Sequence, residues 1–305
     1  DCGFGNFRGI KMSKNIPDSF NAAVIRQKGG PFEIEQVKRL SMNDDEVLVR
    51  VVATGMCHTD MIARDQVFPV PHPIVLGHEG SGVVEAVGSR VRNIVPGDHV
   101  VLTFLNCDEC HACHEGHPAY CENFNPHNFS GQRIDGTHAL ASGDGSKLND
   151  RFFGQSSFGE YAVANARNVI KVRKDAPLEL LGPLGCGIQT GAGTVMNVLK
   201  VTPGSSFVAW GGGAVGLSAV MAAAAVGATT IISVDIVPSR LELAKKIGAT
   251  HVINSKEEDP EAGRSSRWIQ RVLPSWSRIW SLRCARVVQR PSSEPPIRVQ
   301  WPNLI

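Results

Sequence analysis

The chain has 305 residues, of which 42% are hydrophobic and 20% are charged, and this length allows two domains with separate cores. The formal net charge is +2, yet residues 261–305 hold eight arginines against two acids, so the preceding 260 residues are net acidic. An acidic body opposes a nucleic-acid surface, and no apolar run reaches the roughly 18 residues of a membrane span. We therefore expect no nucleic-acid partner and no membrane partner.

The eight cysteines indicate the compartment. Four of them lie between residues 107 and 121, and two of the others, Cys57 and Cys186, lie alone beside unusual neighbours. In a chain of this size, clustered cysteines bind metal more often than they form disulfides. We therefore expect a reducing, cytoplasmic location.

The chain starts irregularly and then becomes rich in strands. Residues 1–17 predict no regular element, and we interpret residues 1–11 as upstream sequence translated together with the protein, because Met12 opens an ordinary-looking protein start. From residue 18 to 175, β-branched runs bounded by glycine and proline predict strands. The clearest are residues 46–55, 81–88 and 98–104.

Residues 176–260 change to an alternating pattern. Short buried runs separated by helical segments predict β-α-β-α-β, which is typical of the first half of a doubly wound parallel sheet, the Rossmann fold. The strands are expected at residues 205–210, 229–235 and 250–254, and the helices at residues 214–227 and 238–249.

The alternating pattern of strands and helices ends after Pro260. Residues 261–305 contain four of the five tryptophans and show no helical or strand period. We expect this segment to be an out-of-frame or disordered extension that replaces the true C-terminal part. The alternative is a genuine basic interaction tail.

A glycine-rich turn lies between the first strand and helix of the second half. Residues 211–216 read GGGAVG and fit the pattern G-x-G-x-x-G, which lets a pyrophosphate approach a helix N-terminus. Asp235 ends the next strand, where a carboxylate binds ribose hydroxyls and repels a 2′-phosphate, so NAD is favoured over NADP; Arg240 flanks the same ribose. The alternative is a turn without ligand. The predicted cofactor contacts of the turn are Gly211, Gly213, Ala214, Val215 and Gly216.

Three scattered residues form a candidate catalytic metal set. His78 lies in GHEGSG, Cys57 lies about twenty residues upstream in TGMCHTD, and Cys186 lies far downstream in GPLGCG. Two thiolates and one imidazole leave a fourth position of a zinc ion for water or substrate. The alternative is that both cysteines are buried free thiols, and spacing alone does not exclude it.

The run CDECHACHEGHPAYC predicts a second metal site. Four thiolates close a tetrahedral zinc site without an open position, so we expect a structural role. We expect the intervening histidines, His111, His114 and His117, to be solvated. The predicted ligands are Cys107, Cys110, Cys113 and Cys121.

Together these motifs resemble the zinc-dependent medium-chain alcohol dehydrogenases over residues 18–260. GHEGSGVVEAVGSRV fits that family's zinc signature, and TGMCHTD, the four-cysteine lobe, GCGIQTGAG and GGGAVG follow in the family's order. NFSGQRIDGTHAL with FFGQSSFGEYAV looks most like the aryl-alcohol (benzyl-alcohol) dehydrogenases. The resemblance implies an α/β protein with a GroES-like catalytic domain over residues 18–175 and a truncated Rossmann domain over residues 176–260.

The resemblance also implies the roles of the metal-site residues. Cys57, His78 and Cys186 hold the catalytic zinc, and Glu79 lies behind the metal as an occasional ligand. Asp60 hydrogen-bonds His78 and orients it.

Two further roles concern substrate and cofactor. The resemblance implies that Thr59 hydrogen-bonds the substrate oxygen and that His58 approaches the cofactor pyrophosphate. At the position of Ile62, many members carry a histidine that completes a proton relay to solvent. This chain lacks that histidine, and the resemblance implies that the aryl-alcohol members lack it too. Ile62 and Phe68 are candidates for an apolar substrate pocket.

The implied reaction is reversible oxidation of a primary, aromatic alcohol with hydride transfer to NAD, using two zinc ions per chain. The family forms homo-oligomers, and the anomalous tail makes us expect an unstable, poorly active chain. A zinc module that binds nucleic acid is the alternative class, but it leaves the dinucleotide motif and the scattered set without a role. A reductase-like relative without catalytic zinc is opposed by Cys57, His78 and Cys186.

Overall fold

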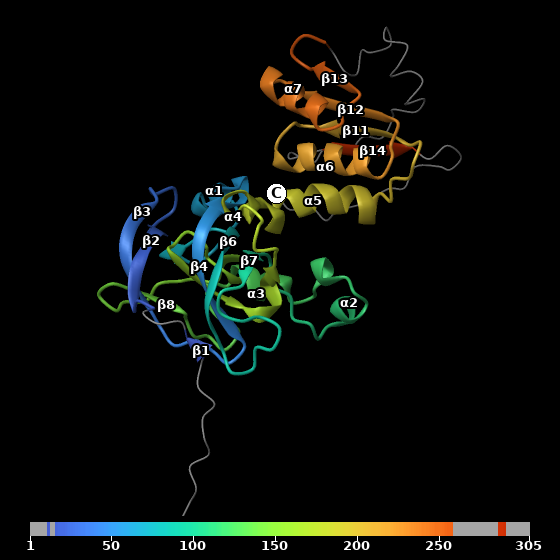
Figure 1. Ribbon diagram of the computed structural model, residues 1–305. Coiled ribbons are helices and arrows are strands. Elements are labelled where there is room, and N and C mark those ends of the chain that lie inside the picture. Colours follow the sequence, from blue (N-terminus) through green and yellow to red (C-terminus); the bar gives the residue numbers. More distant parts are fainter. Residues whose placement is uncertain (1–10, 13–15, 259–285, 291–305) are drawn as a thin grey trace, which may run out of the picture. The chain divides into compact units, whose positions relative to one another are not determined.

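The computed structural model describes residues 11–12, 16–258 and 286–290 (Figure 1). They belong to two compact units, the first ending at Cys186 and the second starting at Gly187.

The first unit contains two antiparallel sheets. The six-stranded sheet has the order β10-β7-β6-β4-β9, with β1 paired to β6, and the four-stranded sheet has the order β5-β2-β3-β8. The strands of the larger sheet are β1 (Lys11–Met12), β4 (Glu46–Gly55), β6 (Glu79–Val87), β7 (His99–Leu102), β9 (Tyr161–Asn165) and β10 (Val169–Lys171). Those of the smaller sheet are β2 (Ser19–Ile25), β3 (Glu33–Arg39), β5 (Ile74–Val75) and β8 (Leu140–Ser142).

The long strand β4 shows why this sheet forms. Its sequence EVLVRVVATG is rich in β-branched residues, which pack well on a pleated surface. The first four residues are buried on both faces, and the rest alternate between half-buried and exposed. Strand β4 is therefore an inner strand of its sheet, where it pairs with β6 on one side and with the edge strand β9 on the other.

Short helices and turns connect the strands of the first unit and carry most of the site residues. The α-helices are α1 (His58–Arg64), α2 (His111–His114), α3 (Phe124–Phe129) and α4 (Leu178–Leu181). The 3-10 turns are η1 (Pro118–Tyr120), η2 (Phe152–Gly154), η3 (Ala166–Asn168) and η4 (Gly182–Gly185).

Two main apolar clusters form the core of the first unit. One is centred on β2 and includes Phe20, Val24 and Phe152, and the other is centred on β4 and includes Val49 and Leu102. Burial of such side chains is the principal favourable term in folding.

The second unit contains a four-stranded sheet of order β13-β12-β11-β14. Strands β11, β12 and β13 are parallel, whereas β14 pairs antiparallel with β11. The strands are β11 (Ser206–Trp210), β12 (Thr230–Asp235), β13 (His251–Asn254) and β14 (Arg286–Arg290). The helices are α5 (Gly187–Gly193), a π turn η5 (Thr194–Val198), α6 (Ala214–Ala225) and α7 (Pro238–Lys246).

Helix α6 packs against β11 and β12, and α7 packs against β12 and β13. The buried positions of α6 are all small or β-branched, such as Gly216, Ala219 and Val220, which lets the helix approach the sheet closely. They join Phe207 and Ile231 in one apolar cluster. The predicted β-α-β-α-β order is thus confirmed, and so is the α/β class.

Two expectations about boundaries are corrected. The predicted division at residue 175 is eleven residues too early, because residues 178–185 pack on β4, β6 and β7 of the first unit. The Ser81 hydroxyl, for example, donates to the Leu178 carbonyl at 2.6 Å. In the anomalous tail, which predicted no strand, Arg286–Arg290 forms β14; the rest of residues 261–305 lies outside the described residues.

At the other end, Lys11–Met12 of the predicted irregular extension pairs with Ala86 and Val87 of β6. Residues 1–10, which we interpreted together with Lys11 as upstream sequence, lie outside the described residues. None of the helices in the described ranges has both the length and the apolar character that crossing a lipid bilayer requires.

Candidate functional site

The three scattered ligand candidates meet in the first unit. Cys57 precedes α1, His78 directly precedes β6, Glu79 is the first residue of β6, and Cys186 follows the turn η4. One ligand atom from each of these four residues lies within 4.8 Å of all the others. Residues more than a hundred positions apart in the sequence therefore form one candidate metal centre.

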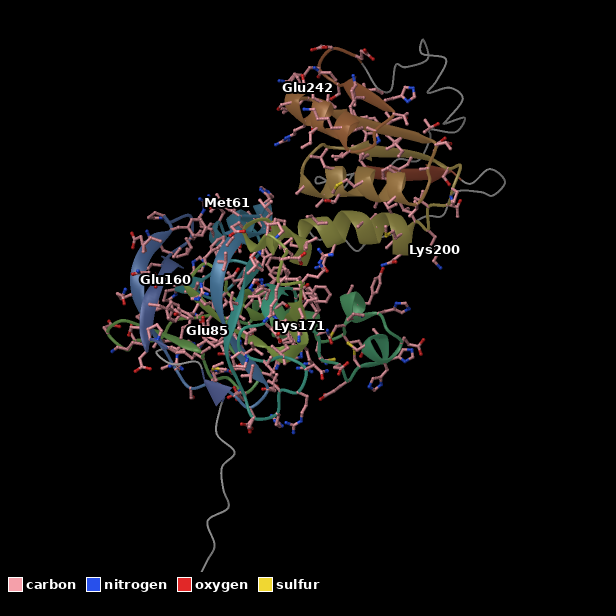
Figure 2. All side chains as sticks on the ribbon, in the orientation of Figure 1. Met61, Glu85, Glu160, Lys171, Lys200 and Glu242 are labelled. Carbon is pink, nitrogen blue, oxygen red and sulfur yellow. The ribbon has the colours of Figure 1, made fainter. Side chains whose placement is uncertain are left out.

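Asp60 holds two of these residues together. It is fully buried in the first turn of α1, where Oδ2 accepts the backbone N–H of Cys57 at 3.0 Å. Its Oδ1 accepts the backbone N–H of Gly77 at 3.0 Å and lies 3.1 Å from Nδ1 of His78. The carboxylate thus fixes which nitrogen of His78 faces the other ligand candidates. Helix α1, which carries Asp60, can be found in Figure 2 by the label of Met61.

His78 presents its other nitrogen to the centre. The side chain is 1% exposed, and Nε2 has no hydrogen-bond partner among the described residues. A buried, unpaired ring nitrogen is costly unless a proton donor or a metal ion satisfies it. This atom and its sulfur neighbours therefore fit a metal ion.

The sulfur separation is compatible with a zinc ion. Sγ of Cys186 donates to Sγ of Cys57 at 4.0 Å, far beyond a disulfide bond of about 2.05 Å. Two thiolates in a tetrahedral zinc site with bonds of about 2.3 Å lie about 3.8 Å apart. The donor set of two thiols and one imidazole matches an open, catalytic type of site.

The pKa values at this centre are shifted because Cys57, Cys186 and His78 lie close together. The hydrogen bond from Cys186 is the main cause that lowers the pKa of Cys57 to about 3, although burial opposes it. The same contact, together with burial, raises the pKa of Cys186. Burial lowers the pKa of His78, but Asp60 and the neighbouring Cys57 outweigh it and raise the value to about 9. A bound metal ion replaces the protons that these groups share.

A glycine allows Glu79 to enter the centre. Glu79 is 5% exposed. A Cβ atom at Gly55 would lie 2.0 Å from Oε2 of Glu79, so any larger residue there would displace the carboxylate. The structure thus places Glu79 beside the metal set, as its predicted role requires.

Thr59 and His58 lie at the start of α1. Sγ of Cys57 and Oγ1 of Thr59 are 3.6 Å apart, so the hydroxyl lies beside the centre. His58 is exposed, and its contact with a cofactor remains a prediction. Ile62 is half-buried on the same helix and offers no proton acceptor.

An aromatic cluster covers His78, and most of it escaped sequence analysis. The ring of Phe153 stacks on the imidazole with centroids 4.5 Å apart and planes 22° apart, and Phe152 meets it edge-on at 5.5 Å. Phe129 contacts both phenylalanines and also Phe68, the ring that the sequence singled out. Aromatic rings therefore cover one side of the His78 imidazole.

The four-cysteine lobe forms the second centre. The four sulfurs lie within 4.8 Å of one another, and Cys107 Sγ lies 3.5 Å from Cys121 Sγ and 3.9 Å from Cys113 Sγ. These separations again match the edge of about 3.8 Å in a tetrahedral zinc site. His111, His114 and His117 are exposed and belong to neither ligand group.

Backbone N–H groups support the sulfurs of this lobe. Glu109 and Cys110 donate to Sγ of Cys107 at 3.5 and 3.3 Å, and Glu122 donates to Sγ of Cys110 at 3.4 Å. The bond from Glu109 is the main cause that lowers the pKa of Cys107 to about 6, against burial. Such donors stabilise thiolates, so the lobe fits a closed site for a metal cation.

The glycine-rich turn leads into α6 in the second unit. Gly211 has φ +98°, and a Cβ at Gly216 would lie 1.8 Å from the Gly211 carbonyl, so only glycine fits there. Gly213 is the N-cap of α6, and a Cβ there would meet nothing within 4 Å. Open space before a helix N-terminus fits an approaching pyrophosphate. The adjoining Ala214 and Val215 form the first turn of the helix.

Asp235 ends β12 beside this turn. Its Oδ1 accepts the backbone N–H groups of Ile236 and Val237 at 2.8 Å each, and Oδ2 accepts that of Gly212. Burial raises the pKa of Asp235, but these bonds outweigh it and hold the pKa below its ordinary value. Arg240 Nη1 lies 3.7 Å from Oδ2. An ionised carboxylate is therefore fixed next to the turn.

Comparison with known proteins identifies both units. Residues 43–174 match the alcohol dehydrogenase GroES-like domain, and residues 214–270 match the zinc-binding dehydrogenase domain. The predicted GroES-like and Rossmann domains are thereby confirmed as fold types. The second match continues past Pro260, where the recognisable motifs end.

Similar proteins, two with solved structures and one known by sequence, carry the names of alcohol dehydrogenases too. A zinc-binding alcohol dehydrogenase domain protein from Burkholderia ambifaria is 61% identical, with TM-score 0.79, over 81% of this chain and 67% of that one. Benzyl alcohol dehydrogenase from Acinetobacter calcoaceticus is 57% identical, with TM-score 0.78, over 84% of this chain and 68% of that one. Geraniol dehydrogenase from Castellaniella defragrans is 53% identical over 79% of this chain, which spans only 64% of that relative's length.

Proposed function

The chain belongs to the zinc-dependent medium-chain alcohol dehydrogenase family, and on this premise we propose that it oxidises a primary alcohol to the aldehyde with transfer of hydride to NAD. The observation that carries the proposal is the convergence of Cys57, His78 and Cys186 in one centre, separate from the closed four-cysteine lobe. A structural role needs only the second centre, whereas an open set of three ligands is what catalysis requires.

The residues of the first centre divide the work. Bound zinc supplies a Lewis acid that lowers the pKa of an alcohol. Asp60 orients His78 toward it, and the Thr59 hydroxyl, beside Cys57 Sγ, would take the proton of the alcohol oxygen while it releases its own hydroxyl proton outward. Ile62 cannot pass that proton on, so water or buffer takes it up from Thr59.

The second unit binds the nucleotide in the proposal. The N–H groups at the start of α6 hold the pyrophosphate, and Asp235 accepts hydrogen bonds from the adenosine ribose. Because a fixed carboxylate repels a 2′-phosphate, NAD is the expected cofactor. Arg240 flanks the same ribose.

The substrate is an alcohol whose hydroxyl-bearing carbon is bonded to an sp² carbon. Benzyl alcohol and geraniol, the substrates that name two of the relatives, share this feature. The ring of Phe153 stacks on His78, and Phe129 and Phe68 extend the aromatic cluster from Phe153, which supports an apolar, flat substrate group.

The test is an assay of NADH formation by the full 305-residue chain with benzyl alcohol and geraniol. Cyclohexylmethanol is the matched control, because it has the size of benzyl alcohol without its sp² carbon. The proposal predicts turnover that is low overall, because of the anomalous tail, but clearly faster with the first two alcohols than with the control. Equal rates on all three contradict the substrate class, and no NADH with any alcohol contradicts the activity.

The remaining parts of the proposal concern the cell. Two sets of reduced thiols suit a reducing compartment, so we place the protein in the cytoplasm. Membership of the family supports a homo-oligomer, which sedimentation of the purified chain tests directly.

A further inference from the structure

The ligands of the first centre come from three distant parts of one unit, and their spacing needs support. Asp60 joins Cys57 to His78 through its two carboxylate oxygens. It makes no bond to the segment that carries Cys186. The bond from Ser81 to the Leu178 carbonyl joins β6 to this segment eight residues before Cys186, so a connection nearer to Cys186 helps to fix its distance from His78.

Gln155 provides one end of that connection. Its side chain is 1% exposed. Nε2 donates to the carbonyl of His78 at 3.0 Å and to the carbonyl of Thr103 at 3.1 Å. Oε1 accepts the backbone N–H of Gly80 at 3.2 Å. Both amide hydrogens and the oxygen are used, so one buried side chain joins the start of β6 to the residue that follows β7.

Thr103 provides the other end. Its hydroxyl donates to the carbonyl of Gly185 at 3.2 Å, and Gly185 directly precedes Cys186. A continuous path of hydrogen bonds therefore runs from the backbone of His78, through Gln155 and Thr103, to the backbone next to Cys186.

The segment around Gln155 is held in an unusual conformation. Arg151, Phe153 and Ser156 all have positive φ, at 70°, 51° and 49°, a region that non-glycine residues avoid unless the surroundings determine it. Arg151 forms a buried ion pair with Glu46, and the Ser156 hydroxyl donates to the Val75 carbonyl at 2.6 Å.

We propose that Gln155 is a positioning residue of the metal centre: together with Thr103 it sets the separation of His78 and Cys186, and so the affinity of the site for zinc. The inference rests on the proposed function, because it presumes that these residues bind zinc. Supporting groups that orient metal ligands typically change metal affinity by about 10- to 100-fold when they are removed.

The experiment compares the full chain with Gln155→Met, which keeps the length of the side chain and removes all three hydrogen bonds. Asn128→Leu is the matched control. Asn128 is also fully buried and makes three bonds to backbone groups, but its partners are Leu105 and Phe124 and none of the first centre. Each zinc-loaded protein is exposed to a chelator and a thiol-alkylating reagent, and peptide masses report the alkylation rate at each cysteine.

We expect Gln155→Met to speed alkylation of Cys57 and Cys186 by about tenfold or more, while the four cysteines of the lobe react as in the parent. Asn128→Leu should lower the melting temperature and leave the rates at Cys57 and Cys186 unchanged. Parental rates at these two cysteines in Gln155→Met overturn the inference, and so do equal increases in both variants.

If Gln155→Met does not fold, Thr103→Val decides, because it keeps the shape of the side chain and removes the hydroxyl that donates to the Gly185 carbonyl. A faster reaction at Cys57 and Cys186 supports the inference, and a parental rate overturns it. The zinc content of the parent is read separately: a parent that binds no zinc contradicts the proposed function, whereas a zinc-loaded parent with unaffected variants contradicts only the role of Gln155.

Discussion

Asp60 Oδ1 lies 3.1 Å from Nδ1 of His78, and both side chains are buried. The contact decides the chemistry of the centre, because it leaves Nε2 of His78 as the nitrogen that faces Cys57 and Cys186. A carboxylate in this place also makes the imidazole a better metal ligand.

Asp60→Asn should therefore weaken zinc binding at the first centre by about 10- to 100-fold and lower alcohol oxidation accordingly. The amide removes the charge and no longer selects one ring nitrogen of His78. Titration with a competing chelator measures the effect. Asp65→Asn, at the C-terminal end of the same helix, is the control and should bind zinc like the parent. A parental zinc affinity in Asp60→Asn would show that the contact does not orient the ligand.

Cys110→Ala should reduce stability before it affects the chemistry. Removal of one of four ligands opens the closed site, and structural zinc contributes directly to the free energy of folding, so a loss of several kcal/mol is expected. Thermal unfolding with and without added zinc is the measurement. His114→Ala, in the same loop, should melt like the parent. A Cys110→Ala protein that melts normally but has no activity would mean that the roles of the two centres are reversed.

Asp235→Ser should change cofactor preference. The serine removes the negative charge that repels a 2′-phosphate, so we expect the preference for NAD over NADP to fall by about tenfold, or roughly 1.4 kcal/mol. The ratio of kcat/KM for the two cofactors measures this. The control is Glu242→Ser, which also removes one negative charge. Glu242 is an exposed residue of α7 (Figure 2). An unchanged ratio in Asp235→Ser would remove this residue from the cofactor site.

Asp150 should make stability depend on pH. It is 1% exposed, and burial raises its pKa from 3.8 to about 6. Because the folded value lies above the unfolded one, the stabilising contribution is complete below about pH 4 and is lost as the pH rises through about 6. Asp150→Asn keeps an acceptor for the N–H groups of Ala139 and Leu140 and removes this titration.

The free energy of unfolding of Asp150→Asn relative to the parent should therefore increase by roughly 1–3 kcal/mol between about pH 4 and about pH 7. Urea unfolding at both pH values checks it. A difference that stays constant would show that Asp150 titrates normally.

The sequence alone indicated the parts of the fold and site that depend on local pattern. β-branched runs marked β4 and β6, and the glycine turn before α6 marked the nucleotide site because only glycine fits at Gly216. The ligand candidates were found because cysteine and histidine occur in a family pattern. Their convergence could not be derived from spacing, since Cys57 and Cys186 are 129 residues apart.

Other features depend on long-range contacts that leave no local signal. Gln155 looks like an ordinary loop glutamine, yet its amide joins β6 to Thr103. Phe153 has a left-handed backbone that nothing in FFGQSS predicts. The true end of the first unit at Cys186 follows from packing of residues 178–185 on β4 and β6, and β14 follows from pairing with β11.

We propose that the chain holds two zinc ions and that only the one bound by Cys57, His78 and Cys186 serves alcohol oxidation. Zinc content and NADH formation, measured together on the full chain and on Cys57→Ala, test it most directly. We expect two zinc ions per parent chain, and one zinc ion with no NADH formation in Cys57→Ala. A parent with a single zinc ion, or a Cys57→Ala protein that still oxidises alcohol at the parental rate, would contradict it.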